Sequence, residues 1–157
     1  MPLLVTAYQF YLTVHILAAI VWVGGAAITQ VYAVRAQATG DPERVAGFAS
    51  DAEFAGRTMF APSAVVLVIF GFLLIHEGNW GYGSGWIDVA LAVWIASFVV
   101  GIGFLGPESG RIGRLIEERG VSAPEVRRRI DRIFLISRIE LLFLLIVVVD
   151  MVTKPGT

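Results

Sequence analysis

Cysteine is absent from the 157 residues of this chain, and charged residues are scarce. The lack of cysteine excludes disulfides, thiolate metal sites, iron–sulfur clusters and cysteine nucleophiles. Charged residues make up 16% of the chain and hydrophobic residues 57%, with a mean hydropathy of +0.76. A soluble domain has about 25% charged residues and does not need so much apolar surface. The composition therefore predicts one integral-membrane domain, residues 1–157, with a few membrane spans.

Four apolar stretches are long enough to cross a hydrocarbon core of about 30 Å as α-helices. They cover residues 8–32, 58–76, 86–105 and 133–152. The first stretch is longer than the core of a signal peptide, and no Lys or Arg precedes it, so we expect it to be retained as a span. The predicted fold is all-α, a four-helix transmembrane bundle whose helices extend into the cytoplasm.

Turn and cap residues separate these stretches. Asp41-Pro42-Glu43 is typical of a helix start, and we expect residues 42–57 to lie at the membrane surface before the second span. Glycines within residues 77–85 allow a tight reversal. Gly120 suits the end of a charged continuation of the third span. Ser122-Ala123-Pro124-Glu125 has the spacing of a capping box and predicts the start of the last helix.

Arginine gathers in two of the three connections between the stretches. Ten arginines lie in or beside the first and third connections, and the middle connection has neither Lys nor Arg: Arg35, Arg44, Arg57, Arg111, Arg114, Arg119, Arg127, Arg128, Arg129 and Arg132. By the positive-inside rule the two Arg-rich connections lie in the cytoplasm, and both chain ends lie outside with the loop around Trp80. We therefore expect a multi-pass protein of a bacterial cytoplasmic (inner) membrane.

The Arg-rich segment around Gly120 predicts contact with anionic lipid headgroups. Acidic residues alternate with its arginines, which argues against nucleic-acid binding: Glu117, Glu118, Glu125 and Asp131. The expected partner is therefore the lipid bilayer.

His15 is the one ionisable side chain within the first apolar stretch. A histidine inside a membrane span costs free energy unless the bundle uses or satisfies it. Small residues such as Ala18, Gly24 and Gly25 let another helix approach closely, either in the same chain or in a homo-oligomer. His15 is therefore the residue that a functional interpretation must explain.

With the predicted topology, each span contributes one polar group to the outer half of the bundle: His15, His76, Asp88 and Asp150. Two imidazoles on facing helices commonly bind haem iron, and an aromatic such as Trp86 suits the rim of a porphyrin. Two histidines and two carboxylates also resemble a site for a divalent metal. The simpler alternative is that His76 and the two aspartates are near-terminal groups that reach water.

A second polar cluster lies toward the cytoplasm. Arg138 and Glu140 lie within the last apolar stretch, and Glu53 and Arg57 are spaced i,i+4, so they can pair along one helix. We expect a structural ion-pair network in which Arg138 extends to the interface. The alternative is that Arg138 holds an anionic ligand or one that bears propionates.

Several short motifs resemble known bacterial membrane proteins. His15-Ile16-Leu17, followed by Val21-Trp22-Val23-Gly24-Gly25, resembles the opening helix of the four-helix CopD-like and HemJ-type proteins. Nearly the whole chain resembles a family of predicted bacterial integral-membrane proteins of unknown function. That likeness lies in the first-helix motif, Pro62 with Gly71, Gly85-Trp86 and residues 151–155.

HemJ-type proteins are haem-binding protoporphyrinogen oxidases that use a first-helix histidine and a third-helix lysine, so the resemblance implies a haem-ligand role for His15. No lysine occurs in residues 85–91, which argues against the oxidase activity but not against haem binding, for which His76 can supply the other ligand. CopD-like proteins are associated with copper uptake, for which three methionines and no cysteine supply few ligands.

The leading hypothesis is a membrane protein that binds haem b through His15 and His76, with Arg138 and Trp86 as further candidates for contact with the cofactor. Such a protein acts in electron transfer with a redox partner, in haem or porphyrin handling, or in sensing. One alternative is a metal-handling or transport subunit that uses the histidines with Asp88 and Asp150. The other is a non-catalytic membrane module that assembles through its small-residue faces.

Overall fold

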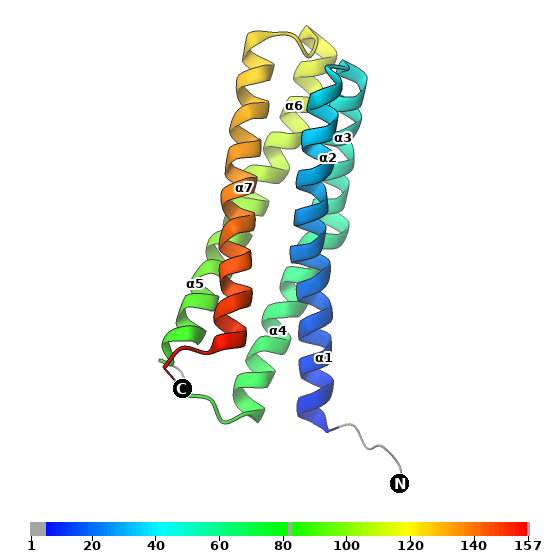
Figure 1. The fold of residues 1–157 in the computed structure, drawn as a ribbon. Coiled ribbons are helices and arrows are strands. Elements are labelled where there is room, and N and C mark those ends of the chain that lie inside the picture. The colour runs from blue at the N-terminus through cyan, green and yellow to red at the C-terminus, as the bar shows by residue number, and fades with distance from the viewer. Residues whose placement is uncertain (1–5, 82, 157) are drawn as a thin grey trace.

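The computed structural model describes residues 6–81 and 83–156, apart from the side chain of Pro42. Over these residues the chain forms four long helices and no strand, which confirms the all-α prediction. The α-helical segments are α1 (Ala7–Ala19), α2 (Gly25–Thr39), α3 (Pro42–Ala55), α4 (Ala61–Glu77), α5 (Gly85–Val100), α6 (Gly106–Arg119) and α7 (Pro124–Thr153). The long helices alternate in direction and bring both chain ends to one end of the bundle (Figure 1).

The first three long helices each contain a π-helical segment that joins two α-helical segments. These are η1 (Ile20–Gly24) between α1 and α2, η2 (Gly56–Phe60) between α3 and α4, and η3 (Gly101–Leu105) between α5 and α6. The fourth long helix is α7 alone, which runs without such a break. Single π-helical turns inside α-helices occur frequently at functional sites.

Two of these segments share a sequence pattern: Gly, four residues, Ala or Gly, then Pro. It occurs at residues 56–62 and again at residues 101–107. Proline has no N–H, so it cannot bond the carbonyl four residues earlier as an α-helix requires. In both segments, the residue before the proline donates its N–H to the carbonyl of the first glycine, five residues back. The wider turn thus lets each long helix continue past a proline.

The half of the bundle that contains the two Arg-rich connections, which we call the Arg-rich half, has a core like that of a soluble protein. Helices α2, α3, α6 and the first part of α7 meet there. Their buried side chains form one cluster: Ala33, Val45, Ile112, Ile116, Val126, Ile130 and Phe134. This half therefore has apolar contacts that fix all four helices relative to one another.

A buried carboxylate ties α6 to α7 in the Arg-rich half. Glu108 is only 5% exposed, and its Oε1 lies 2.6 Å from Nη1 of Arg129. Its other oxygen lies 3.6 Å from Nη1 of Arg111. The hydrogen bond and the charge of Glu108 raise the pKa of the Arg129 guanidinium above its usual value. Arg129 therefore stays charged, and Glu108 keeps a cationic partner.

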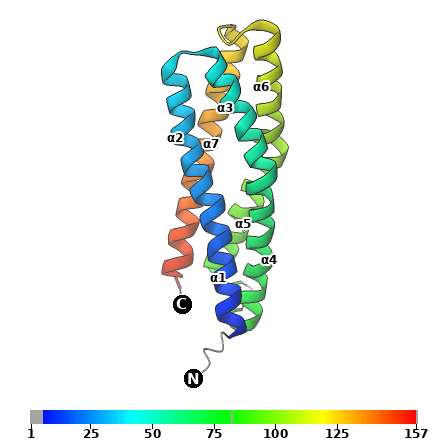
Figure 2. The same ribbon diagram turned by 90° about the vertical axis from the view of Figure 1, so that its right-hand side faces the viewer.

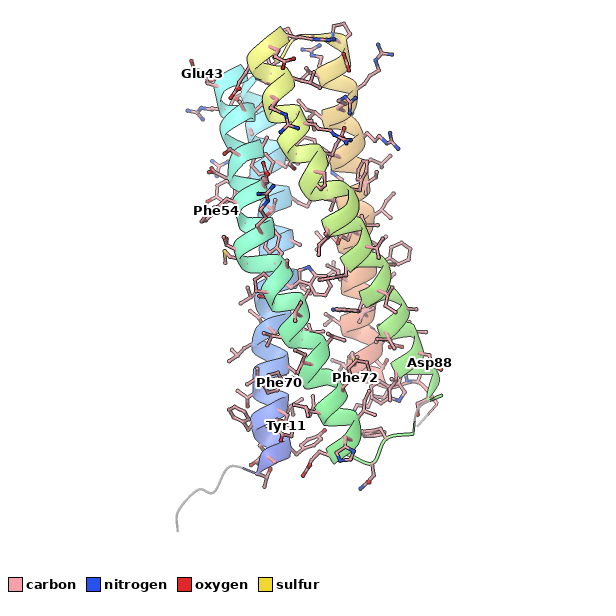
Figure 3. The ribbon with its side chains drawn as sticks, turned by 180° about the vertical axis from the view of Figure 1, so that it is seen from behind. Tyr11, Glu43, Phe54, Phe70, Phe72 and Asp88 are labelled. Atoms are coloured by element: carbon pink, nitrogen blue, oxygen red, sulfur yellow. The ribbon has the colours of Figure 1, made fainter. Side chains whose placement is uncertain are left out.

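The other half, which we call the His-containing half, is built from two helix pairs. Helix α1 packs along α4 and α5 packs along α7, but few contacts join α4 to α5. Tyr11 of α1 and Phe70 of α4 lie edge to face with ring centroids 5.9 Å apart (Figure 3). The two pairs meet near the middle of the bundle, around the buried residues Trp22, Ala64 and Leu144.

Two expectations about the connections are corrected. Residues 42–57 do not form a helix of their own, because α3 continues through η2 into α4 as one long helix beside α2 and α6 (Figure 2). The capping box at residues 122–125 does not form either. The N-cap of α7 is Ala123, and no side chain caps this helix. The predicted N-cap Asp41 is confirmed, since its side chain accepts a hydrogen bond from the N–H of Glu43.

Three of the four long helices are long and apolar enough to cross a membrane. They are Ala7–Thr39, Glu43–Glu77 and Gly85–Arg119, as far as the described residues extend. They contain the first three predicted spans and continue beyond them. The fourth predicted span, residues 133–152, lies within α7 but carries Arg138, Glu140 and Asp150, so by composition this helix is more polar than the other three.

Candidate functional site

His15 lies at the contact between α1 and α4. Its Nδ1 is 2.9 Å from the backbone carbonyl oxygen of Leu67. Its ring also lies against Gly71, where a Cβ would come within 3.3 Å of His15 Cε1. The glycine therefore provides the space that lets the imidazole reach the backbone of α4.

The hydrogen bond to Leu67 fixes the tautomer of His15. A carbonyl oxygen can only accept, so Nδ1 carries the hydrogen and donates it. A neutral imidazole then has its lone pair on Nε2, which makes no hydrogen bond within the described part of the chain. Metal-binding histidines almost always donate their other ring N–H in this way, often to a backbone carbonyl. The same bond also satisfies one polar atom of a packed histidine.

His76 is placed differently from His15. It lies in the last turn of α4 and is exposed. It lies five positions after Gly71, the residue of α4 that contacts His15, and five positions rise about 7.5 Å along an α-helix. Both histidines are thus in the His-containing half, as predicted, but the structure does not bring them to one level.

The two aspartates also lie in the His-containing half. Asp88 is exposed in the first turn of α5, and Asp150 lies near the end of α7 with one carboxylate oxygen buried and unbonded. Across residues 6–81 and 83–156, no three His, Asp or Glu side chains form a group that could hold a metal ion. The four residues proposed for a divalent metal are therefore not assembled into such a group.

Trp86 lies in an aromatic cluster at the end of the bundle. It is buried, and its ring meets Trp80 edge to face with centroids 5.4 Å apart. Nζ of Lys154 lies 4.5 Å from the centroid of Trp80 and 5.4 Å from that of Trp86. Cation–π contact therefore connects the end of α7 to the loop between α4 and α5.

The predicted ion-pair cluster forms only in part. Arg57 donates to Glu53 across 2.6 Å, as their spacing predicts. Arg138 is exposed, and neither it nor Glu140 makes an ion pair or hydrogen bond with any residue that the structure describes. Since Arg138 and Glu140 are two residues apart, they point in different directions on α7. The network expected around them is therefore absent from this part of the chain.

A cavity of about 430 Å³ lies between the four long helices. It extends along the middle of the bundle, where residues of η2 and η3 line it. Its walls are mostly apolar, and its polar lining includes Thr29, Gln30, Glu53, Ser137 and Glu140. Ligand sites have this combination of an apolar concave surface with a few polar groups, and volumes of about 300–1,000 Å³.

A family model described as a predicted integral membrane protein (DUF2269) matches residues 9–155. The chain belongs to this family. Membership in DUF2269 makes it an integral membrane protein in contact with a lipid bilayer, and confirms the resemblance to a family of predicted membrane proteins. The chain has no significant match among curated proteins or solved structures.

Sequence reasoning missed the central cavity and three of its polar residues, Thr29, Gln30 and Ser137. Nε2 of Gln30 donates to Oγ of Ser137 across 2.6 Å, although the two residues are 107 positions apart in the chain. The pattern that could have pointed to this level of the bundle is the Gly-to-Pro spacing shared by residues 56–62 and 101–107.

Proposed function

We propose that this DUF2269 protein binds haem b, with His15 as the axial ligand from the protein. The observation that carries the proposal is the hydrogen bond from Nδ1 of His15 to the carbonyl of Leu67. It holds the imidazole in the tautomer that offers Nε2 as a ligand, and it fixes the orientation of the ring. Coordination of iron through Nε2 would also compensate for placing a histidine in a membrane span.

The residues around His15 are compatible with an apolar, planar cofactor. His15 lies between the aromatic contact of Tyr11 with Phe70 and the buried cluster around Trp22. Few contacts join the α1/α4 pair to the α5/α7 pair in this half. A flat group between the two pairs would therefore replace little protein–protein packing.

His76 is not needed as the second ligand in this proposal. Its exposure, and the rise of about 7.5 Å that separates it from Gly71, favour a haem that His15 alone attaches to the protein. When bound, haem supplies one-electron chemistry or a gas-binding iron. The chain's own part is to hold Nδ1–H at Leu67 and to exclude water from the ring.

The orientation is part of the same proposal. All four long helices cross a bacterial inner membrane, both ends of the chain lie outside, and the Arg-rich half faces the cytoplasm. Support comes from the ten arginines in or beside the first and third connections and from α7, which packs against the first and third long helices (Figure 1). Pairing with the neighbouring helices limits how much of the polar face of α7 meets lipid.

The test is to express the protein with haem supply, purify it and record its visible spectrum. We expect a Soret band in the wild type, its loss in His15→Ala and its retention in His76→Ala. A wild-type protein without haem would overturn the proposal, and so would an unaltered haem spectrum in His15→Ala. Melting curves of the two variants show whether each is folded, so that loss of haem can be separated from loss of structure.

A further inference from the structure

We infer that the central cavity is a binding site for an organic cation, a small molecule with a protonated amine and an apolar body. The cavity of about 430 Å³ and its lining, described above, carry this inference. It does not depend on haem, because His15 does not line the cavity.

Three hydrogen-bond donors that line the cavity are committed to the protein itself. The hydroxyl of Thr29 donates to the backbone carbonyl of Gly25 across 2.8 Å. The hydroxyl of Ser137 donates to the backbone carbonyl of Phe134 across 3.1 Å. The amide nitrogen of Gln30 is bonded to Ser137. The two hydroxyls therefore have no hydrogen left for an anion, and the donors that stay open include the uncharged hydroxyls of Ser97 and Ser109.

The acceptors, in contrast, are left open. The side-chain oxygen of Gln30 is buried and has no hydrogen-bond partner within the described residues. Because Ser137 and Glu140 are three apart on α7, they share a face of the helix, and the carboxylate of Glu140 is also unbonded. A ligand that donates hydrogen bonds would satisfy both oxygens.

The charge balance of the cavity favours a positive ligand. Glu53 and Arg57 both line it and neutralise each other through their 2.6 Å contact. Glu140 then remains as a carboxylate without a cation among the residues that the structure describes. Glu140 is half-buried, and a charge withdrawn from water without a partner is costly, so this carboxylate favours a cation next to it.

The aromatic residues that line the cavity favour a ligand with an apolar body. Trp22, Phe60, Phe98 and Phe134 contribute aromatic rings, which bind organic cations as well as apolar groups. A hydrated inorganic ion would leave these surfaces without a partner. A primary ammonium attached to a compact hydrocarbon group matches both the acceptors and the walls.

The probe pair is 4-tert-butylbenzylammonium and 4-tert-butylbenzoate, which have similar shapes and opposite charges. Their binding to the full chain in lipid nanodiscs is measured by equilibrium dialysis, with empty nanodiscs subtracted. We expect saturable binding of the ammonium to the wild type and none of the benzoate. Glu140→Gln should weaken ammonium binding at least tenfold, whereas Asp131→Asn on the exposed face of α7 should leave it unchanged.

Three results would overturn the inference: no saturable binding of the ammonium, equal binding of the benzoate, or undiminished ammonium binding in Glu140→Gln. The comparison of the two probes on the wild type decides the matter even if a variant does not fold. The His15→Ala protein should bind the ammonium as the wild type does. The failure of the haem proposal is thus distinguishable from the failure of this one.

Discussion

Gly71 lies directly against the imidazole of His15, so that a Cβ on residue 71 would meet Cε1 at 3.3 Å and Nδ1 at 3.6 Å. The lack of a side chain on Gly71 therefore makes room for the imidazole of His15 at the α1/α4 contact. A larger side chain at this position must push the ring away from the carbonyl of Leu67.

Gly71→Val should destabilise the protein by about 1–3 kcal/mol, the usual cost of overpacking, and should lower the haem content on the proposed function. Gly24→Val is the matched control, since a Cβ there meets no atom within 4 Å. Thermal melting in detergent and the Soret absorbance per protein measure the two effects. A Gly71→Val protein that melts and binds haem like Gly24→Val would contradict the proposed contact.

Glu108→Ala should destabilise the Arg-rich half. The carboxylate is buried and accepts a hydrogen bond from Arg129, and bonds to charged groups contribute about 1.5–3 kcal/mol. Glu117→Gln, an exposed change on the same helix, should stay within about 0.5 kcal/mol of the wild type. Denaturant titration of both variants gives the difference, and equal stabilities would show that Glu108 is solvated.

The cavity can be filled from one of its glycines. Gly101 lines it and Gly103 does not, and a Cβ added at either glycine would meet no atom within 4 Å. Gly101→Leu should therefore weaken binding of 4-tert-butylbenzylammonium about tenfold, a loss of about 1.4 kcal/mol, and Gly103→Leu should not. Equilibrium dialysis in nanodiscs compares ammonium binding to the two variants. If Gly101→Leu and Gly103→Leu change the affinity equally, the ammonium does not bind in the cavity.

Because the chain has no cysteine, single cysteines can report its orientation. Ser84 lies just before α5 and Ser122 lies between α6 and α7. An impermeant thiol reagent added to intact cells should label Ser84→Cys and not Ser122→Cys. Permeabilised cells, in which both sites should react, are the control. The reverse pattern in intact cells would invert the proposed topology.

Much of the fold could be predicted because apolar runs and cap residues are local signals. The helix start at Asp41 and the pairing of Glu53 with Arg57 could be predicted from residues close together in the sequence. Residues 42–57 misled, because their mixed polarity resembles an interfacial helix. In the structure this segment packs against α2 and α6 instead, and such packing depends on distant parts of the chain.

The candidate sites could be predicted less well. The position of His15 within an apolar span predicted a hydrogen-bond or ligand partner. That partner is the backbone carbonyl of Leu67, and because every residue has such a carbonyl, the sequence could not identify it. The contact of Gln30 with Ser137 joins distant positions that look ordinary in isolation. Glu140 was expected in an ion pair because sequence spacing alone does not say which face of α7 meets the cavity.

The two helix pairs of the His-containing half have a mechanical consequence. They are fixed at the Arg-rich core, and at the opposite end the loop between α4 and α5 joins them through the contacts of Trp80, Trp86 and Lys154. Between these two ends, few contacts resist a change in the spacing of the pairs. We therefore expect that spacing to respond to the lateral pressure and thickness of the bilayer, while the Arg-rich half keeps its shape.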